Sequence, residues 1–93
     1  MTVQITPGRR VHIVGIGGAG MSAIARVLLG RGLRVSGSDL QTNAQTEALA
    51  AEGVVVYDGH AAEHIDDAEL VVISSAVPPT NPEWTAALSR GIP

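Results

Sequence analysis

The chain has 93 residues, of which 45% are hydrophobic and 16% charged, a composition typical of one small globular domain. A net charge of −3 and a near absence of aromatic side chains argue against a nucleic-acid partner and an anionic membrane surface. Cysteine is absent, which excludes disulfides. With no signal peptide and no apolar stretch of the roughly 20 residues that span a bilayer, we expect a cytoplasmic protein.

Short apolar runs alternate with segments of helical character along the whole chain. The runs predict buried strands. The segments after them predict helices, from apolar residues three and four positions apart or from capping residues and stop glycines at their ends. We expect strands at 11–14, 33–36, 54–57 and 70–74, and helices at 21–31, 42–52, 61–64 (a single turn) and 81–90. This alternation predicts a Rossmann-like α/β fold of three layers, with a four-stranded parallel sheet and helices on both faces.

Local signals set the expected helix ends. Gly32 should end the first helix in the left-handed conformation. Thr42 and Gln45 match a capping box, in which each side chain satisfies a free backbone N–H. Asn81 should cap the last helix. Residues 92–93 would begin a fifth strand, so we expect the chain to be a fragment cut before that strand.

A glycine-rich turn connects the first strand to the first helix. In the pattern Gly15-x-Gly17-x-x-Gly20, the first glycine permits the tight turn, the second lets a diphosphate approach and the third lets the helix pack near the strand. Free N–H groups and the positive end of the helix dipole favour phosphate oxygens. The alternative is a glycine-rich corner without a ligand. The strand before it and the helix after it favour nucleotide binding.

Further candidates follow the other strands, at the sheet edge where ligands bind in such folds. Asp39 lies about 20 residues beyond Gly20, where an acidic residue accepts hydrogen bonds from ribose hydroxyls, although it could instead cap the following loop. Ser38 beside it, and His60 after the third strand, could contact a sugar or base. The segment 74–77 offers two hydroxyls and backbone N–H groups, with an ordinary strand-end turn as the alternative.

The histidines also raise the question of a metal site. His60-Ala61-Ala62-Glu63-His64 matches H-x-x-E-H, in which two histidines on a regular helix could share zinc. No third ligand is evident, so we expect no metal, with His64 on a solvated helix face and His12 in a structural role within the first strand. Trp84 should pack the last helix against the sheet.

Several of these segments together resemble one family. Gly15–Ser22, Ser38-Asp39, Gly59-His60, Ser74–Val77 and Asn81-Pro82-Glu83, in this order, are similar to the amino-terminal domain of the Mur ligases of bacterial peptidoglycan biosynthesis. The similarity is strongest to the branch that adds L-alanine to UDP-N-acetylmuramate. It covers essentially the whole chain, and the stretch Gly-Gly-Ala-Gly-Met is much more specific than a bare dinucleotide pattern.

The resemblance implies three domains, of which residues 1–93 would form the first, the UDP-sugar-binding one. ATP and magnesium would bind in the second domain, and the third would complete the amino-acid site. ATP would phosphorylate the muramate carboxylate and L-alanine would attack the acyl phosphate. All six basic residues here are arginines, so the phosphate-binding lysine of an ATP loop is not in this chain. The fragment alone should bind UDP-N-acetylmuramate without catalysis, cofactor or metal.

Carried over by position, the resemblance also implies which residues bind substrate. The turn would hold the diphosphate, and the residues after the second and third strands would lie near the uridine. The implied contacts are Gly15, Gly17, Gly18, Ala19, Gly20, Met21, Ser22, Ser38, Asp39, His60, Ser74, Ser75, Ala76 and Val77. Two alternatives remain open: an NAD(P)-binding domain of a dehydrogenase, which would use the same turn and acidic residue, and a non-catalytic interaction domain with a vestigial pocket.

Overall fold

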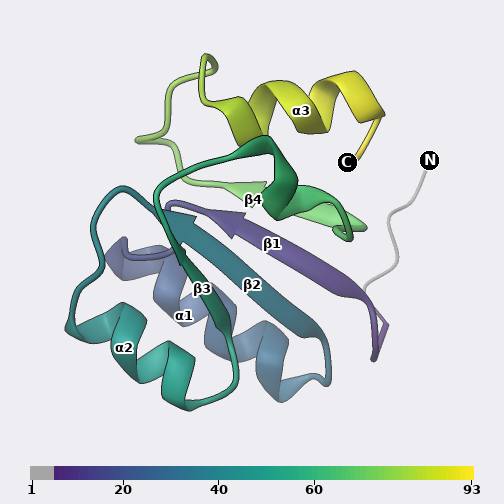
Figure 1. The fold of residues 1–93 in the computed structure, drawn as a ribbon. Helices are drawn as coiled ribbons and strands as arrows, with labels where there is room; N and C mark the ends of the chain where they lie inside the picture. The colour runs from purple at the N-terminus through teal and green to yellow at the C-terminus, as the bar shows by residue number, and fades with distance from the viewer. Residues whose placement is uncertain (1–5) are drawn as a thin grey trace.

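A computed structural model describes residues 6–93 as a parallel sheet with helices on both sides. The strand order is β3-β2-β1-β4, and every neighbouring pair is parallel. The expected three-layer α/β fold is therefore confirmed (Figure 1). In chain order the elements are β1 (Arg10–Val14), α1 (Ala19–Gly30), β2 (Arg34–Asp39), α2 (Ala44–Ala51), β3 (Val55–Asp58), the 3-10 turn η1 (Ala62–Ile65), β4 (Leu70–Ile73) and α3 (Pro82–Arg90).

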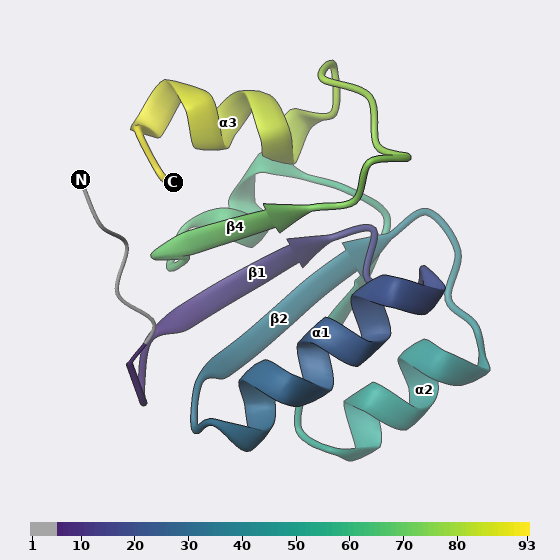
Figure 2. The ribbon, with the colours of Figure 1, turned by 180° about the vertical axis from the view of Figure 1, so that it is seen from behind.

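The two faces of the sheet differ in chemistry. Helices α1 and α2 cover one face (Figure 2), where Val11 and Ile13 of β1 pack in an apolar core with Leu28 of α1 and Leu49 of α2. Side chains alternate along a strand, so His12 points to the opposite face, beneath η1 and the start of α3. The first face therefore contains the main apolar cluster, and the other holds a buried polar cluster beside the buried side chains of Val14, Ile65 and Ala87.

Close approach of the turn to the sheet depends on a glycine that the sequence pattern did not indicate. A Cβ on Gly37 of β2 would lie 2.7 Å from the Cβ of Ile16 and 3.0 Å from the carbonyl oxygen of Ile13. Around Gly20, by contrast, no atom lies within 4 Å of such a Cβ. The packing role expected for Gly20 is wrong, and Gly37 has it. Gly15 has the expected positive φ, +85°, at the tight turn.

The helix ends mostly agree with the prediction. Gly32, with φ +85°, follows the end of α1 as expected. The predicted capping box is wrong by one residue, since α2 begins at Ala44 and its N-cap is Asn43. The Asn43 side chain accepts a hydrogen bond from Thr46 N–H at 2.9 Å. In return, Asn43 N–H donates to Thr46 Oγ1 at 2.8 Å. The carbonyl of Pro93 accepts from Val71 of β4 at 2.8 Å, so the last residue lies beside that strand.

None of the helices within residues 6–93 is long and apolar enough to cross a membrane.

Candidate functional site

A cleft of about 570 Å³ opens at the carboxyl ends of the strands, between the glycine turn and the segment before α3. In parallel α/β sheets this edge is where ligands bind, because loops and helix N-termini converge there. It contains seven of the residues expected to contact substrate. The lining residues are Gly15, Gly18, Asp39, Leu40, His60, Ser74, Ala76, Val77, Pro78, Thr80, Asn81 and Pro82.

The start of α1 forms one wall of this cleft with open backbone donors. Its N-cap is Gly18, which has no side chain, and its first turn contains no acidic residue. The amides of Met21 and Ser22 donate to the Gly18 carbonyl at 3.1 and 3.0 Å. Because the first N–H groups of a helix lack an acceptor inside it, the N-terminus of α1 can offer an amide such as that of Gly20 to an anion. The wall therefore presents backbone N–H donors of the kind that bind anions.

Asp39 closes the glycine turn from the side of β2. Its Oδ2 accepts from the Gly17 amide at 2.9 Å, and its Oδ1 accepts from Gln41 N–H at 3.3 Å. A Cβ on Gly17 would lie 2.9 Å from that Oδ2 and 3.3 Å from Asn43 Nδ2. Asp39 and Asn43 therefore leave little room for a side chain at position 17. A substitution there would disturb the loop as well as any bound diphosphate.

A buried carboxylate lies behind the cleft. Glu83, at the second position of α3, has no exposed surface. Its Oε1 accepts from His12 Nε2 and from the Ser38 hydroxyl, each at 2.6 Å. Its Oε2 contacts His64 Nδ1 at 2.8 Å, the Ala61 amide at 3.1 Å and His60 Nδ1 at 3.3 Å. One carboxylate therefore joins β1, β2, η1 and α3.

The donors around Glu83 keep it ionised. Burial alone would raise the pKa of this carboxyl, but hydrogen bonds from His12, Ser38 and His64, together with the attraction of the charged His12 ring, lower the pKa to about 2. A buried charge is tolerated only when it is paired and fully hydrogen-bonded, and both conditions hold here. The cluster is therefore a buried, hydrogen-bonded connection between the sheet and α3.

The structure agrees with the sequence-based expectation for one of the histidines and contradicts it for another. His12 is fully buried and structural, as expected. The expectation for His64 is wrong: its side chain is only 17% exposed, contacts Glu83 and stacks on Tyr57 with ring centroids 4.0 Å apart. His60 and His64 also do not share a regular helix, because Ala61 is extended and η1 is a 3-10 turn. Among residues 6–93 no group of three potential ligands is placed to hold a metal ion.

Other candidates lie behind the cleft surface. Ser38 is fully buried, and its hydroxyl bonds Glu83 and His60. Ser22 is nearly buried, and Met21 packs against the apolar core. Sequence reasoning missed Glu83 as a partner of the histidines. The only local signal was an acidic residue in the first turn of a helix, which alone indicates no more than a favourable interaction with the helix dipole.

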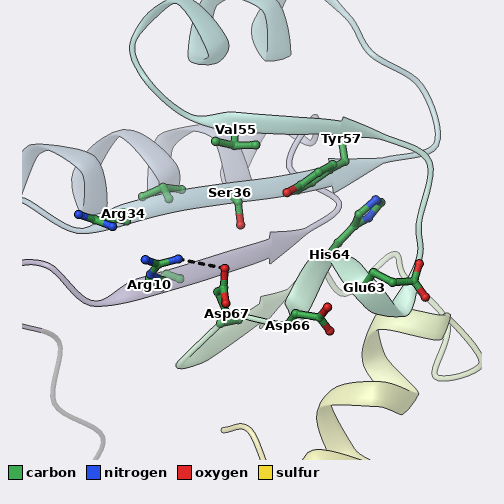
Figure 3. Close-up of a pocket in the computed structure, with 12 residues that line it drawn as sticks. Arg10, Arg34, Ser36, Val55, Tyr57, Glu63, His64, Asp66 and Asp67 are labelled. Carbon is green, nitrogen blue, oxygen red and sulfur yellow. Dashed lines mark hydrogen bonds and ion pairs between the residues drawn. The ribbon is translucent and has the colours of Figure 1, made fainter.

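A second cavity of about 360 Å³ lies over the opposite face of the sheet from α1 and extends to the amino ends of β1, β2 and β3. Figure 3 shows Arg10 and Arg34 at one end of it and Tyr57 and His64 at the other. Arg10 pairs with Asp67 at 3.0 Å. Acidic and basic side chains mix around this cavity, so it has no clear preference for an anion.

Comparison with known proteins identifies the family. The model of the Mur ligase family, catalytic domain, matches residues 10–93. The chain belongs to the Mur ligase family. It is 59% identical over 85 residues to a UDP-N-acetylmuramate–L-alanine ligase of Methylobacillus flagellatus, covering 91% of this chain and 18% of that protein. A ligase of the same name from Thermobifida fusca is 52% identical over 90 residues, covering 97% of this chain and 19% of that protein.

A solved structure agrees with the family assignment. The UDP-N-acetylmuramate–alanine ligase of Thermotoga maritima superposes with a TM-score of 0.87 at 36% identity, covering 90% of this chain and 20% of that one. This Mur ligase chain thus spans about a fifth of the length of the relatives it matches. The family favours the ligase hypothesis over a dehydrogenase domain, with which it would share the turn and the fold.

Proposed function

We propose that this chain binds UDP-N-acetylmuramate as the amino-terminal domain of a cytoplasmic ligase that adds L-alanine to the muramate carboxylate. The observation that carries the proposal is the cleft with an uncapped α1 N-terminus in a chain that belongs to the Mur ligases. Relatives that match nearly all of this chain are named for that reaction.

The chain's own part would be to hold the nucleotide end of the substrate. Amides at the α1 N-terminus, such as that of Gly20, would donate to diphosphate oxygens, helped by the positive end of the α1 dipole. Asp39, His60 and the segment 74–77 would line the uridine side of the cleft. Binding energy from this remote part of the substrate would position the muramate carboxylate for chemistry elsewhere in the enzyme.

The chemical steps would lie outside this domain. The carboxylate oxygen would attack the γ-phosphorus of ATP and release ADP. The L-alanine amine would then attack the acyl phosphate, forming the amide and releasing phosphate. ATP and Mg²⁺ would bind to parts of the enzyme beyond this chain, because it contains no lysine for a phosphate loop. The 93-residue chain alone should therefore bind substrate and catalyse nothing.

A titration followed by backbone amide NMR tests the proposal. UDP-N-acetylmuramate should shift the amides from Gly18 to Ser22 and those around Asp39 and His60. NAD at the same concentration serves as the comparison ligand. Shifts with NAD and none with the UDP-sugar would show that the domain serves a dehydrogenase. No shift with either would support a vestigial pocket and contradict the proposal.

A further inference from the structure

We infer that Glu83, acting through Ser38, is a positioning residue that holds His60 in the Nδ1–H tautomer and thereby gives the cleft a hydrogen-bond acceptor at His60 Nε2. The inference rests on the proposed function of the cleft and adds the chemistry of one contact. It predicts that the ligand presents an N–H or O–H donor to this imidazole.

The single proton of the Ser38 hydroxyl decides the tautomer. Ser38 Oγ lies 2.6 Å from Glu83 Oε1, and an ionised carboxylate can only accept, so the hydroxyl proton points to Glu83. Ser38 Oγ is also 2.8 Å from His60 Nδ1. With its proton already used, the oxygen must accept there, so His60 Nδ1 carries a proton. The same N–H reaches Glu83 Oε2 at 3.3 Å.

His12 makes the shortest contact between Glu83 and a histidine. Its ring is fully buried, its Nε2 lies 2.6 Å from the carboxylate, and its charge is one of the causes that keep Glu83 ionised. His60 makes the longest of the contacts with this carboxylate and couples to it mainly through a neutral hydroxyl. The inference therefore concerns the neutral form of His60, in which one ring nitrogen carries the proton.

The other nitrogen of His60 faces the cleft. His60 lines it, and no hydrogen bond within residues 6–93 involves Nε2. No buried side-chain nitrogen or oxygen in this part of the chain lacks a partner, so Nε2 must be accessible. A neutral imidazole protonated at Nδ1 offers a lone pair at Nε2. The ring N–H of a pyrimidine base and a ribose hydroxyl are the donors that a UDP-sugar could present.

The chain offers a matched pair of variants. Ser38→Ala removes the hydroxyl between Glu83 and His60. Ser36→Ala, two residues earlier in β2, removes a hydroxyl that bonds His12 Nδ1 at 2.7 Å and does not line the cleft. Both are buried or half-buried serines on the same face of the same strand. The two substitutions therefore differ mainly in which histidine loses a hydrogen bond: His60 in Ser38→Ala and His12 in Ser36→Ala.

Long-range proton–nitrogen NMR of the free 15N-labelled chain reports the tautomer directly. The wild type and Ser36→Ala should show His60 with protonated Nδ1 and unprotonated Nε2. Ser38→Ala should shift His60 toward the Nε2–H form. A protonated Nε2 in the wild type, or an unchanged His60 in Ser38→Ala, would overturn the positioning role without any reference to a ligand.

Binding tests the acceptor itself. Ser38→Ala should weaken UDP-N-acetylmuramate by about three- to tenfold, as expected for one hydrogen bond, and Ser36→Ala should leave affinity within about twofold. Comparing UDP with its N3-methyl and 2′-deoxy analogues identifies the donor: the wild type should lose affinity for one of them and Ser38→Ala should not discriminate. If the wild type treats all three alike, His60 is no acceptor. If the wild type binds none of these ligands, the proposed function fails while the NMR result still decides the positioning role.

Discussion

Replacing Glu83 by glutamine should destabilise the fold by about 3 kcal/mol at pH 7. The substitution keeps the shape of the side chain and removes its charge, and it directs an NH₂ group at donors that already surround the carboxylate. The pKa of Glu83 is lowered from 4.5 to about 2. Each unit corresponds to about 1.4 kcal/mol of preference for the charged form in the folded state, which gives the estimate.

The pH dependence has a definite sign. Because the folded-state pKa is lowered, the stabilisation is fully present above 4.5 and is lost as the pH falls from there through about 2. Urea unfolding of wild type and Glu83→Gln should therefore show the full difference at pH 7 and a shrinking difference below about 4.5. The difference between the unfolding free energies of the two proteins removes the contribution of groups that titrate identically in both.

A surface carboxylate provides the control. Glu52 pairs with Arg26 at 3.1 Å, with both side chains nearly half exposed. Glu52→Gln should change stability by at most about 0.5 kcal/mol. A Glu83→Gln cost below about 1 kcal/mol, or one that stays constant from pH 7 down to pH 3, would refute the assignment of Glu83 as a buried ionised carboxylate.

Three glycine substitutions, of which Gly30→Ala is a control, separate folding from binding. Gly37→Ala should cost about 1–3 kcal/mol in urea unfolding, because the new methyl group meets Ile16, whereas Gly30→Ala, with open space around it, should not destabilise the chain. Gly18→Ala should cost at most about 1 kcal/mol, the usual preference for glycine over alanine at an N-cap, since its φ is −68° and the nearest atom to the new Cβ would lie at 3.5 Å. Because Gly18 lines the cleft, the substitution should nevertheless weaken binding of UDP-N-acetylmuramate in calorimetric titration. Unimpaired binding by Gly18→Ala would contradict the place given to the diphosphate.

Local patterns predicted the elements because their causes lie close together in sequence. Buried strands are short apolar runs, and Gly32 ends α1 by a preference that needs no distant partner. The capping box of α2 was misplaced because adjacent polar residues, Thr42 and Asn43, both suit an N-cap, and tertiary packing selects between them: Thr46 is almost fully buried.

The polar cluster behind the cleft could not be predicted in this way. Glu83 and His12 are 71 residues apart and meet only when α3 lies over β1. Ser38 looked like a substrate contact because it follows the strand next to Asp39, but alternation along β2 directs it to the buried face. The choice between Gly20 and Gly37 likewise depends on where Ile16 lies, which is a property of the packed fold.

A crystal structure of the chain with UDP-N-acetylmuramate would test the central claim most directly. The diphosphate should lie against the amides at the α1 N-terminus, with the uridine in the cleft beside His60. The cavity between Arg10 and Tyr57 should remain without the nucleotide. A diphosphate bound at Arg10 and Arg34, or a nucleotide that leaves the α1 N-terminus untouched, would contradict the account.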